Sequence, residues 1–206
     1  MSRLPILSIG MLAAALALGC GDQPAPTAPV STPQMDVPSG ITETTTTLGV
    51  AALAHASGGP SAVNADLAQL RRLVAPYHNV DKALADGYVL ESVCVSDPLL
   101  GAMGFHAPNL TLRNDAEISL LQPDVLVYER TPNGKFRLNA VEYFVLKSTW
   151  DAAHGGAGAA PPVLFGQNVP LSDHPPFGQH YELHVWLFQH NPSGIFALWN
   201  PTVSCP

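Results

Sequence analysis

The sequence predicts an α+β domain in which one or two N-terminal helices pack on an antiparallel sheet and a single disulfide bond cross-links the domain. Three observations lead to this fold class: a helical stripe at residues 61–76, alternating strands on both sides of Asn133-Gly134, and the distant cysteines Cys94 and Cys205. Of the 206 residues in the chain, residues 48–206 are expected to form one domain.

The first 19 residues are organised like a secretory signal peptide. One early cation, Arg3, precedes an uncharged apolar run that ends in small residues before Cys20. The junction LALGC resembles the lipobox of bacterial lipoproteins, although Ala17 and Leu18 stand where Leu and a small residue are most usual. We therefore expect residues 1–19 to be removed and Cys20 to carry lipid, with a plain secreted protein as the alternative.

Residues 20–47 are rich in Pro, Thr and Ser and contain few large apolar side chains. Such a segment cannot bury enough surface to offset its ordering entropy, so it is expected to be a flexible tether. The predicted location is the cell envelope, in the periplasm or at the cell surface, with the membrane as partner through the lipid on Cys20.

Composition excludes several classes of function. Without Arg3, eight Lys and Arg face sixteen Asp and Glu, and the cations are scattered, so nucleic acid is not an expected partner. The chain has no phosphate-binding glycine loop, no Gly-x-Ser-x-Gly nucleophile motif and no Cys-x-x-Cys pair.

The cysteine count supports export. If lipid occupies Cys20, then Cys94 and Cys205 remain as an even pair. A disulfide between them would close a loop of about 110 residues and stabilise the fold by about 4 to 5 kcal/mol in the chain-entropy model. The alternative is two buried thiols.

The helices and the first hairpin follow from spacing. Residues 61–76 place apolar side chains at three- and four-residue steps, and a second short helix is expected over residues 79–87. Asn133-Gly134 tolerates positive φ and predicts a tight turn between two strands. The apolar stripe of the first helix consists of Val63, Leu67, Leu70 and Val74.

The second strand of this hairpin contains an unusual acid. Alternation directs one set of side chains to the same face: Leu138, Ala140, Glu142, Phe144 and Leu146. Glu142 thus stands among apolar neighbours and must find a partner, bind a cation or take up a proton. The alternative to a cation is a salt bridge to an arginine or a hydrogen bond to a buried amide.

The segment GQHYELHVWLFQH, residues 178–190, is expected to be a strand. Its core face would carry Tyr181, Leu183, Val185 and Leu187, and its other face His180, Glu182, His184, Trp186, Phe188 and His190. On a strand the Cα atoms of His180 and His184 stand about 13 Å apart. One ion is therefore better shared by Glu182 and one flanking histidine.

Metal ligands from other segments would complete such a site. His106 follows a glycine-interrupted segment, GAMGFH, which is expected to form a loop that approaches a pocket. Imidazole combined with carboxylate suits zinc, iron or copper. The candidate ligands are His106, His184, Glu142, Glu182 and His180.

The remaining histidines and a long connection are expected at the surface. The surface histidines are His55, His78, His154 and His174. Residues 148–179 are expected to form a long loop, either a cover for the pocket or a variable insertion. Its Gly-Ala run is flexible, whereas its PPVLFGQ block could dock on the domain.

Several blocks resemble an uncharacterised family of exported bacterial proteins: GAMGFH, PDVLVYE, AVEYFV, HYELHVWLFQHNPSGIFALWNP and the terminal VSC. The resemblance covers about the last 110 residues. It implies an exported compartment and a shared domain, and it implies no reaction.

Two hypotheses of function remain. In the first, the anchored domain binds a metal ion or a small ligand in a His/Glu pocket, with catalysis undecided. In the second, it is a structural or protein-interaction module whose polar residues only satisfy one another. An arginine beside Glu142 would favour the second hypothesis, and two imidazoles there would favour the first.

Overall fold

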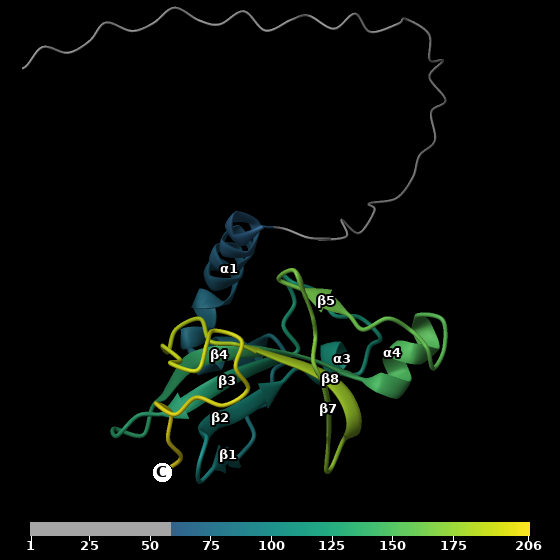
Figure 1. Ribbon diagram of the computed structural model, residues 1–206. Helices are drawn as coiled ribbons and strands as arrows, with labels where there is room; N and C mark the ends of the chain where they lie inside the picture. Colours follow the sequence, from purple (N-terminus) through teal and green to yellow (C-terminus); the bar gives the residue numbers. More distant parts are fainter. Residues whose placement is uncertain (1–58) are drawn as a thin grey trace, which may run out of the picture. The chain divides into compact units, whose positions relative to one another are not determined.

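The computed structural model describes residues 59–206, which belong to one compact unit of the chain (Figure 1). An antiparallel sheet of six strands forms its centre, in the order β1-β2-β3-β4-β8-β7. This confirms the predicted α+β class with an antiparallel sheet. The predicted signal peptide, linker and lipidated Cys20 lie outside the described residues. The strands are β1 (Cys94–Asp97), β2 (Gly101–Pro108), β3 (Val125–Arg130), β4 (Phe136–Leu146), β7 (Leu171–His174) and β8 (Gly178–Val185).

Two helices precede the sheet, as predicted. Helix α1 (Pro60–Val74) buries apolar side chains of its predicted stripe, and the 3-10 helix η1 (Ala75–His78) follows it. Helix α2 (Val80–Ala85) begins after Asn79, whose side chain accepts a hydrogen bond from the backbone N–H of Asp81. In the described part of the chain, no helix is long and apolar enough to cross a membrane.

The predicted hairpin joins β3 and β4, and Gly134 has a φ of 80° in its turn. A β-bulge shifts the register between these strands: Val127 faces Ala140, whereas Tyr128 faces Leu138. The extra residue reverses the facing of β4 at this point. The prediction that Leu138 shares a face with Ala140 is therefore wrong, because Leu138 lies in the main core.

The two faces of the sheet carry different cores. The main core includes Leu70 and Val74 of α1 and apolar side chains from β3, β4 and β8. The C-terminal segment, yellow in Figure 1, contributes to a smaller cluster and pairs with β2 through a bridge between Asn200 and Ala102. This smaller cluster consists of Ala102, Val127, Ala140, Trp186 and Val203.

A disulfide bond between Cys94 and Cys205 ties the C-terminal segment to β1. This confirms the predicted pairing. The two cysteines are separated by 111 positions in the sequence, so the bond links the end of the chain to the first strand of the sheet.

The segment between β4 and β8 is more ordered than a long loop. It contains α4 (Lys147–Ala153), a small hairpin of β5 (Val163–Leu164) and β6 (Gln167–Asn168), and strand β7. The prediction of one long loop over residues 148–179 is thus wrong, while the predicted docking of PPVLFGQ is confirmed. The side chains that attach the segment to the main core are Leu164, Phe165 and Val169.

Strand β8 shows the predicted alternation. The strand ends at Val185, earlier than predicted. Phe188 consequently packs against the main core instead of sharing a face with the histidines. Within the strand, Tyr181, Leu183 and Val185 belong to the main core, while His180, Glu182 and His184 are buried outside it.

Candidate metal centre

The polar face of β8 borders a cavity of about 350 Å³. Side chains from β2, β4 and the β7–β8 hairpin form much of its wall, and Arg113 and Trp199 also line it. The wall includes five residues that could ligate a metal: His106, Glu142, His174, His180 and Glu182.

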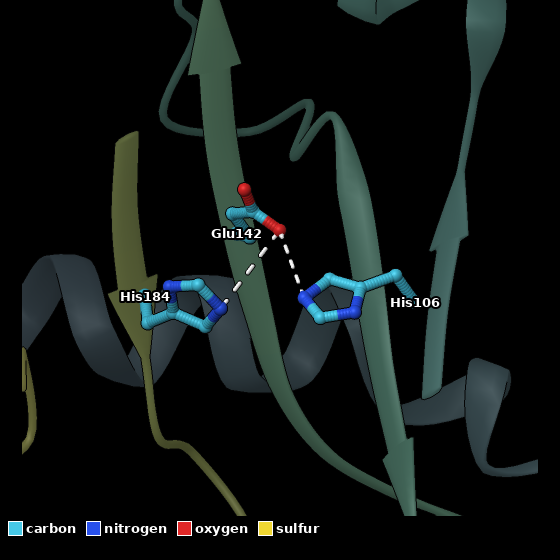
Figure 2. Close-up of side chains that lie close together, drawn as sticks. All are labelled: His106, Glu142 and His184. Carbon is cyan, nitrogen blue, oxygen red and sulfur yellow. Dashed lines mark ion pairs between the residues drawn. The ribbon is translucent and has the colours of Figure 1, made fainter. Parts of the chain in front are cut away.

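Three side chains from three strands converge in the first group (Figure 2). His184 on β8 lies directly opposite Glu142 on β4, so the register of these strands brings them together. His106 on β2 reaches the same carboxylate across β3. Nε2 of His106 lies 3.5 Å from Oε2 of Glu142, and Nε2 of His184 lies 3.8 Å from the same oxygen.

Gly104 allows β2, the strand that carries His106, to approach β3 closely. Its φ is 116°, and a Cβ atom at this position would lie 2.3 Å from the carbonyl oxygen of Tyr128. Only glycine permits this close approach of β2 to β3. The prediction of a loop at this position is wrong, because Gly104 and His106 both lie on strand β2.

The spacing of the first group fits a metal ion better than direct hydrogen bonds. The distances of 3.5 and 3.8 Å exceed the usual hydrogen-bond range, which ends at about 3.2 Å. Two ligand atoms of a tetrahedral zinc ion, each about 2.0–2.1 Å from the metal, lie about 3.3–3.4 Å apart. One ligand atom from each of the three residues lies within 4.8 Å of the others, so these atoms would have to move closer together to reach the spacing of zinc ligands.

Burial decides the protonation of this group. Desolvation lowers the pKa of His106 to about 4, and desolvation together with the nearby His106 lowers the pKa of His184 to about 3. Burial, with a further contribution from the Glu182 carboxylate, raises the pKa of Glu142 well above its usual range. At neutral pH both imidazoles are therefore neutral and can offer a lone pair to a cation.

Glu142 forms no ion pair with a guanidinium in the described part of the chain, where the two side chains that face its Oε2 are imidazoles. Arg113 lines the same cavity, but its guanidinium lies over the rings of Phe144 and Phe177, at 5.6 and 5.2 Å from their centroids. The charge of Arg113 lowers the pKa of Glu142, and the effect of burial outweighs it. This arrangement is the one expected for a metal site.

The buried polar atoms of His184 strengthen this interpretation. The side chain is fully buried, and neither Nδ1 nor Nε2 has a hydrogen-bond partner among the residues that the structure describes. An unpaired buried polar atom costs about 1–3 kcal/mol. The ring is also stacked beside Trp186, with 6.2 Å between centroids, which restrains its plane.

The second group contains His174, His180 and Glu182, and it lies on the β7–β8 hairpin. Nε2 of His174 and Nε2 of His180 each lie 3.6 Å from Oε1 of Glu182. The five predicted ligands are therefore divided between two groups. His180 and Glu182 belong to the second group, and the other three predicted ligands form the first. This division agrees with the expectation that one strand does not bring His180 and His184 to one ion.

His174 is the residue that sequence reasoning missed. It was expected only at the surface, and its side chain is 46% exposed, yet it also faces Glu182. The signal was available in HPPFGQH, residues 174–180, where two histidines flank a short turn containing prolines and a glycine. A tight hairpin places both histidines on the same face, because His174 pairs with Gly178 and Ser172 pairs with His180.

The fold and the site define the class of protein: an α+β domain with buried His/Glu groups that could hold a metal ion. No family model, curated protein or solved structure matches the chain. The resemblance to a family of exported bacterial proteins stays a prediction.

Proposed function

We propose that this protein is an exported, lipid-anchored envelope protein that binds a divalent transition-metal ion through His106, Glu142 and His184. The observation that carries the proposal is the fully buried His184, whose two nitrogens have no hydrogen-bond partner in the described chain although one of them faces the Glu142 carboxylate. A cation between these side chains would give each of them a partner.

The donor set restricts the metal. Two imidazole nitrogens and one carboxylate oxygen suit zinc, non-haem iron or copper, whereas calcium and magnesium prefer oxygen ligands throughout. Three protein ligands leave at least one coordination position for another molecule.

The open position would face the cavity, because His106 and Glu142 lie on its wall. The volume of about 350 Å³ falls within the range of pockets that hold small molecules. The protein would thus present its metal ion to a small ligand.

The proposed location rests on the sequence. Residues 1–19 and the LALGC junction are typical of a lipoprotein leader. The Cys94–Cys205 disulfide is compatible with an oxidising compartment. Lipid on Cys20 would keep the metal-binding domain at a membrane surface.

Metal analysis of the purified full-length chain tests the binding proposal. After reconstitution with Zn²⁺, Fe²⁺ or Cu²⁺, we expect the first group to retain its ion through dialysis, and His106→Ala, His184→Ala or Glu142→Gln to lower the bound metal by one ion per chain. His190→Ala is the matched control, because His190 is exposed and outside the cavity. Metal retention that is equal in the wild type and all three site variants would contradict the proposal.

The anchor needs a separate test. Mass spectrometry of the protein from membranes should find lipid on Cys20, and Cys20→Ser should release the chain from the membrane fraction. A wild-type protein recovered with an unmodified Cys20 would refute lipid anchoring and leave the metal proposal unaffected.

A further inference from the structure

The second group, His174, His180 and Glu182, has a bonding pattern that points to a lone-pair site. Nδ1 of His180 donates a hydrogen bond to the carbonyl oxygen of Gly178 over 2.7 Å. Nδ1 of His174 donates to the carbonyl oxygen of Pro175 over 3.2 Å. A carbonyl only accepts, so Nδ1 of each ring carries the proton and Nε2 of the neutral ring is left with a lone pair.

Both lone pairs meet a carboxylate oxygen. Nε2 of His174 and Nε2 of His180 each face Oε1 of Glu182 at 3.6 Å. Where a ring holds only the proton on Nδ1, its Nε2 and the carboxylate oxygen are both acceptors and cannot form a hydrogen bond with one another. Three acceptors that face one another are best satisfied by a cation between them.

Burial strengthens the need for a cation between these acceptor atoms, because water cannot reach the buried ones among them to form hydrogen bonds. His180 has a fully buried side chain, and Glu182 is 5% exposed. Nε2 of His180 and Oε1 of Glu182 have no hydrogen-bond partner within residues 59–206. The ring of His180 is stacked on Phe144, with 4.7 Å between centroids, which restrains it from turning toward another partner.

The contacts of the two Nδ1 atoms are those of metal-binding histidines. A ligating imidazole usually donates its second N–H to a carbonyl or a carboxylate, which fixes the tautomer and directs the free nitrogen at the metal. Both histidines of the second group have this contact. His174, on the exposed side of the group, would also let an ion enter from solvent.

We propose that His174, His180 and Glu182 form a second site for a divalent transition-metal ion, on the same cavity as the first. Glu182 and His184 are two residues apart on β8, about 7 Å along the strand, and the two groups share no side chain. The two ions would therefore be held separately, instead of forming a close pair of metals about 3.5–4 Å apart.

Metal stoichiometry tests this proposal independently of the first site. Equilibrium dialysis of the full-length chain against Zn²⁺ or Co²⁺, followed by elemental analysis, should give two ions per chain. His180→Ala, Glu182→Gln and His184→Ala should each leave one ion, and the double variant His180→Ala/His184→Ala should leave none. His190→Ala should retain two. Glu182→Gln nearly preserves side-chain volume, so it keeps the test valid if His180→Ala does not fold.

The outcomes separate the two proposals. A wild type with one ion, lost in His184→Ala and retained in His180→Ala and Glu182→Gln, would overturn the second site and leave the proposed function intact. A single ion with the opposite pattern would support the second site and remove the first. A single ion lost in every site variant would indicate one shared site and overturn the proposal of two.

Discussion

The substitution His184→Leu tests whether the imidazole of His184 stabilises the fold or serves only as a metal ligand. If the polar groups of the cavity merely satisfied one another, removing His184 would deprive Glu142 of a partner and lower the stability. If His184 is a metal ligand, its imidazole destabilises the metal-free protein, and His184→Leu removes that effect.

The expected change in the free energy of unfolding follows from the contacts of His184. Both nitrogens of His184 are buried without a hydrogen-bond partner in the described part of the chain, at about 1–3 kcal/mol each. The variant would lose ring stacking with Trp186, at about 0.5–1.5 kcal/mol, and would suffer some shape mismatch, usually below about 1.5 kcal/mol. From these terms we expect the metal-free variant to be more stable than the wild type by about 1–3 kcal/mol.

With metal bound, we expect the wild type to be more stable than His184→Leu. An ion at about 1,000 times its Kd stabilises the folded wild type by about 4 kcal/mol, and it adds little to a variant that has lost a ligand. Urea unfolding with EDTA and with saturating Zn²⁺ measures both states of each protein. His190→Leu, which alters an exposed histidine, should change stability by no more than about 0.5 kcal/mol in either condition.

One result of the urea experiment would refute the metal-ligand role of His184. If His184→Leu lowers the unfolding free energy in EDTA by about 2 kcal/mol or more, a loss typical of a broken buried contact, the imidazole contributes to the metal-free fold. The structural-module hypothesis would then explain the cavity better than metal binding.

Three further variants test the fold around the site. The double variant Cys94→Ser/Cys205→Ser should lose about 4 to 5 kcal/mol in urea unfolding, because the bond closes a loop of about 110 residues; an unchanged midpoint would contradict this. Gly104→Ala should cost about 1–3 kcal/mol or more, since its Cβ would meet the Tyr128 carbonyl, and normal stability would be inconsistent with that close approach. Burial raises the pKa of Asp124 from 3.8 to about 7, so its contribution to stability is fully present below pH 3.8 and is lost as the pH rises through 7. Asp124→Asn should therefore gain unfolding free energy relative to the wild type as the pH rises across this range, by up to the order of 4 kcal/mol, and a constant difference would count against the shift.

Local patterns predicted much of the fold. The α1 stripe, the turn at Asn133-Gly134 and the alternation of β8 depend on neighbouring residues, and the structure confirms each of them. The disulfide could also be predicted, because only two cysteines follow Cys20. The acid at Glu142 was visible from local pattern as well, since alternation alone placed it among apolar neighbours.

The predictions from the sequence were wrong where contacts between distant parts of the chain determine the local structure. One extra residue turns Leu138 to the main core, and a bulge of this kind leaves no clear mark on a strand sequence. Residues 148–179 look like one loop from their glycines, alanines and prolines, but strand β7 forms there because β8 is available to pair with it. His174 looked like a surface residue because Glu182 comes close to it only when the hairpin forms.

The division of the ligands into two groups depends on strand register. Glu142 faces His184 because β4 and β8 pair in one particular register, and a shift of two residues would place Glu142 opposite Glu182 instead. Two carboxylates would then meet without an imidazole between them, and mutual repulsion would raise the cost of ionising either one. Side-chain patterns fix which face a residue occupies, but only the pairing of the strands decides which partner it meets. The β4–β8 register gives Glu142 its contact with His184, and the β7–β8 hairpin gives Glu182 its contact with His174, so strand pairing, more than the number of histidines, places two candidate cation sites on one face of the sheet.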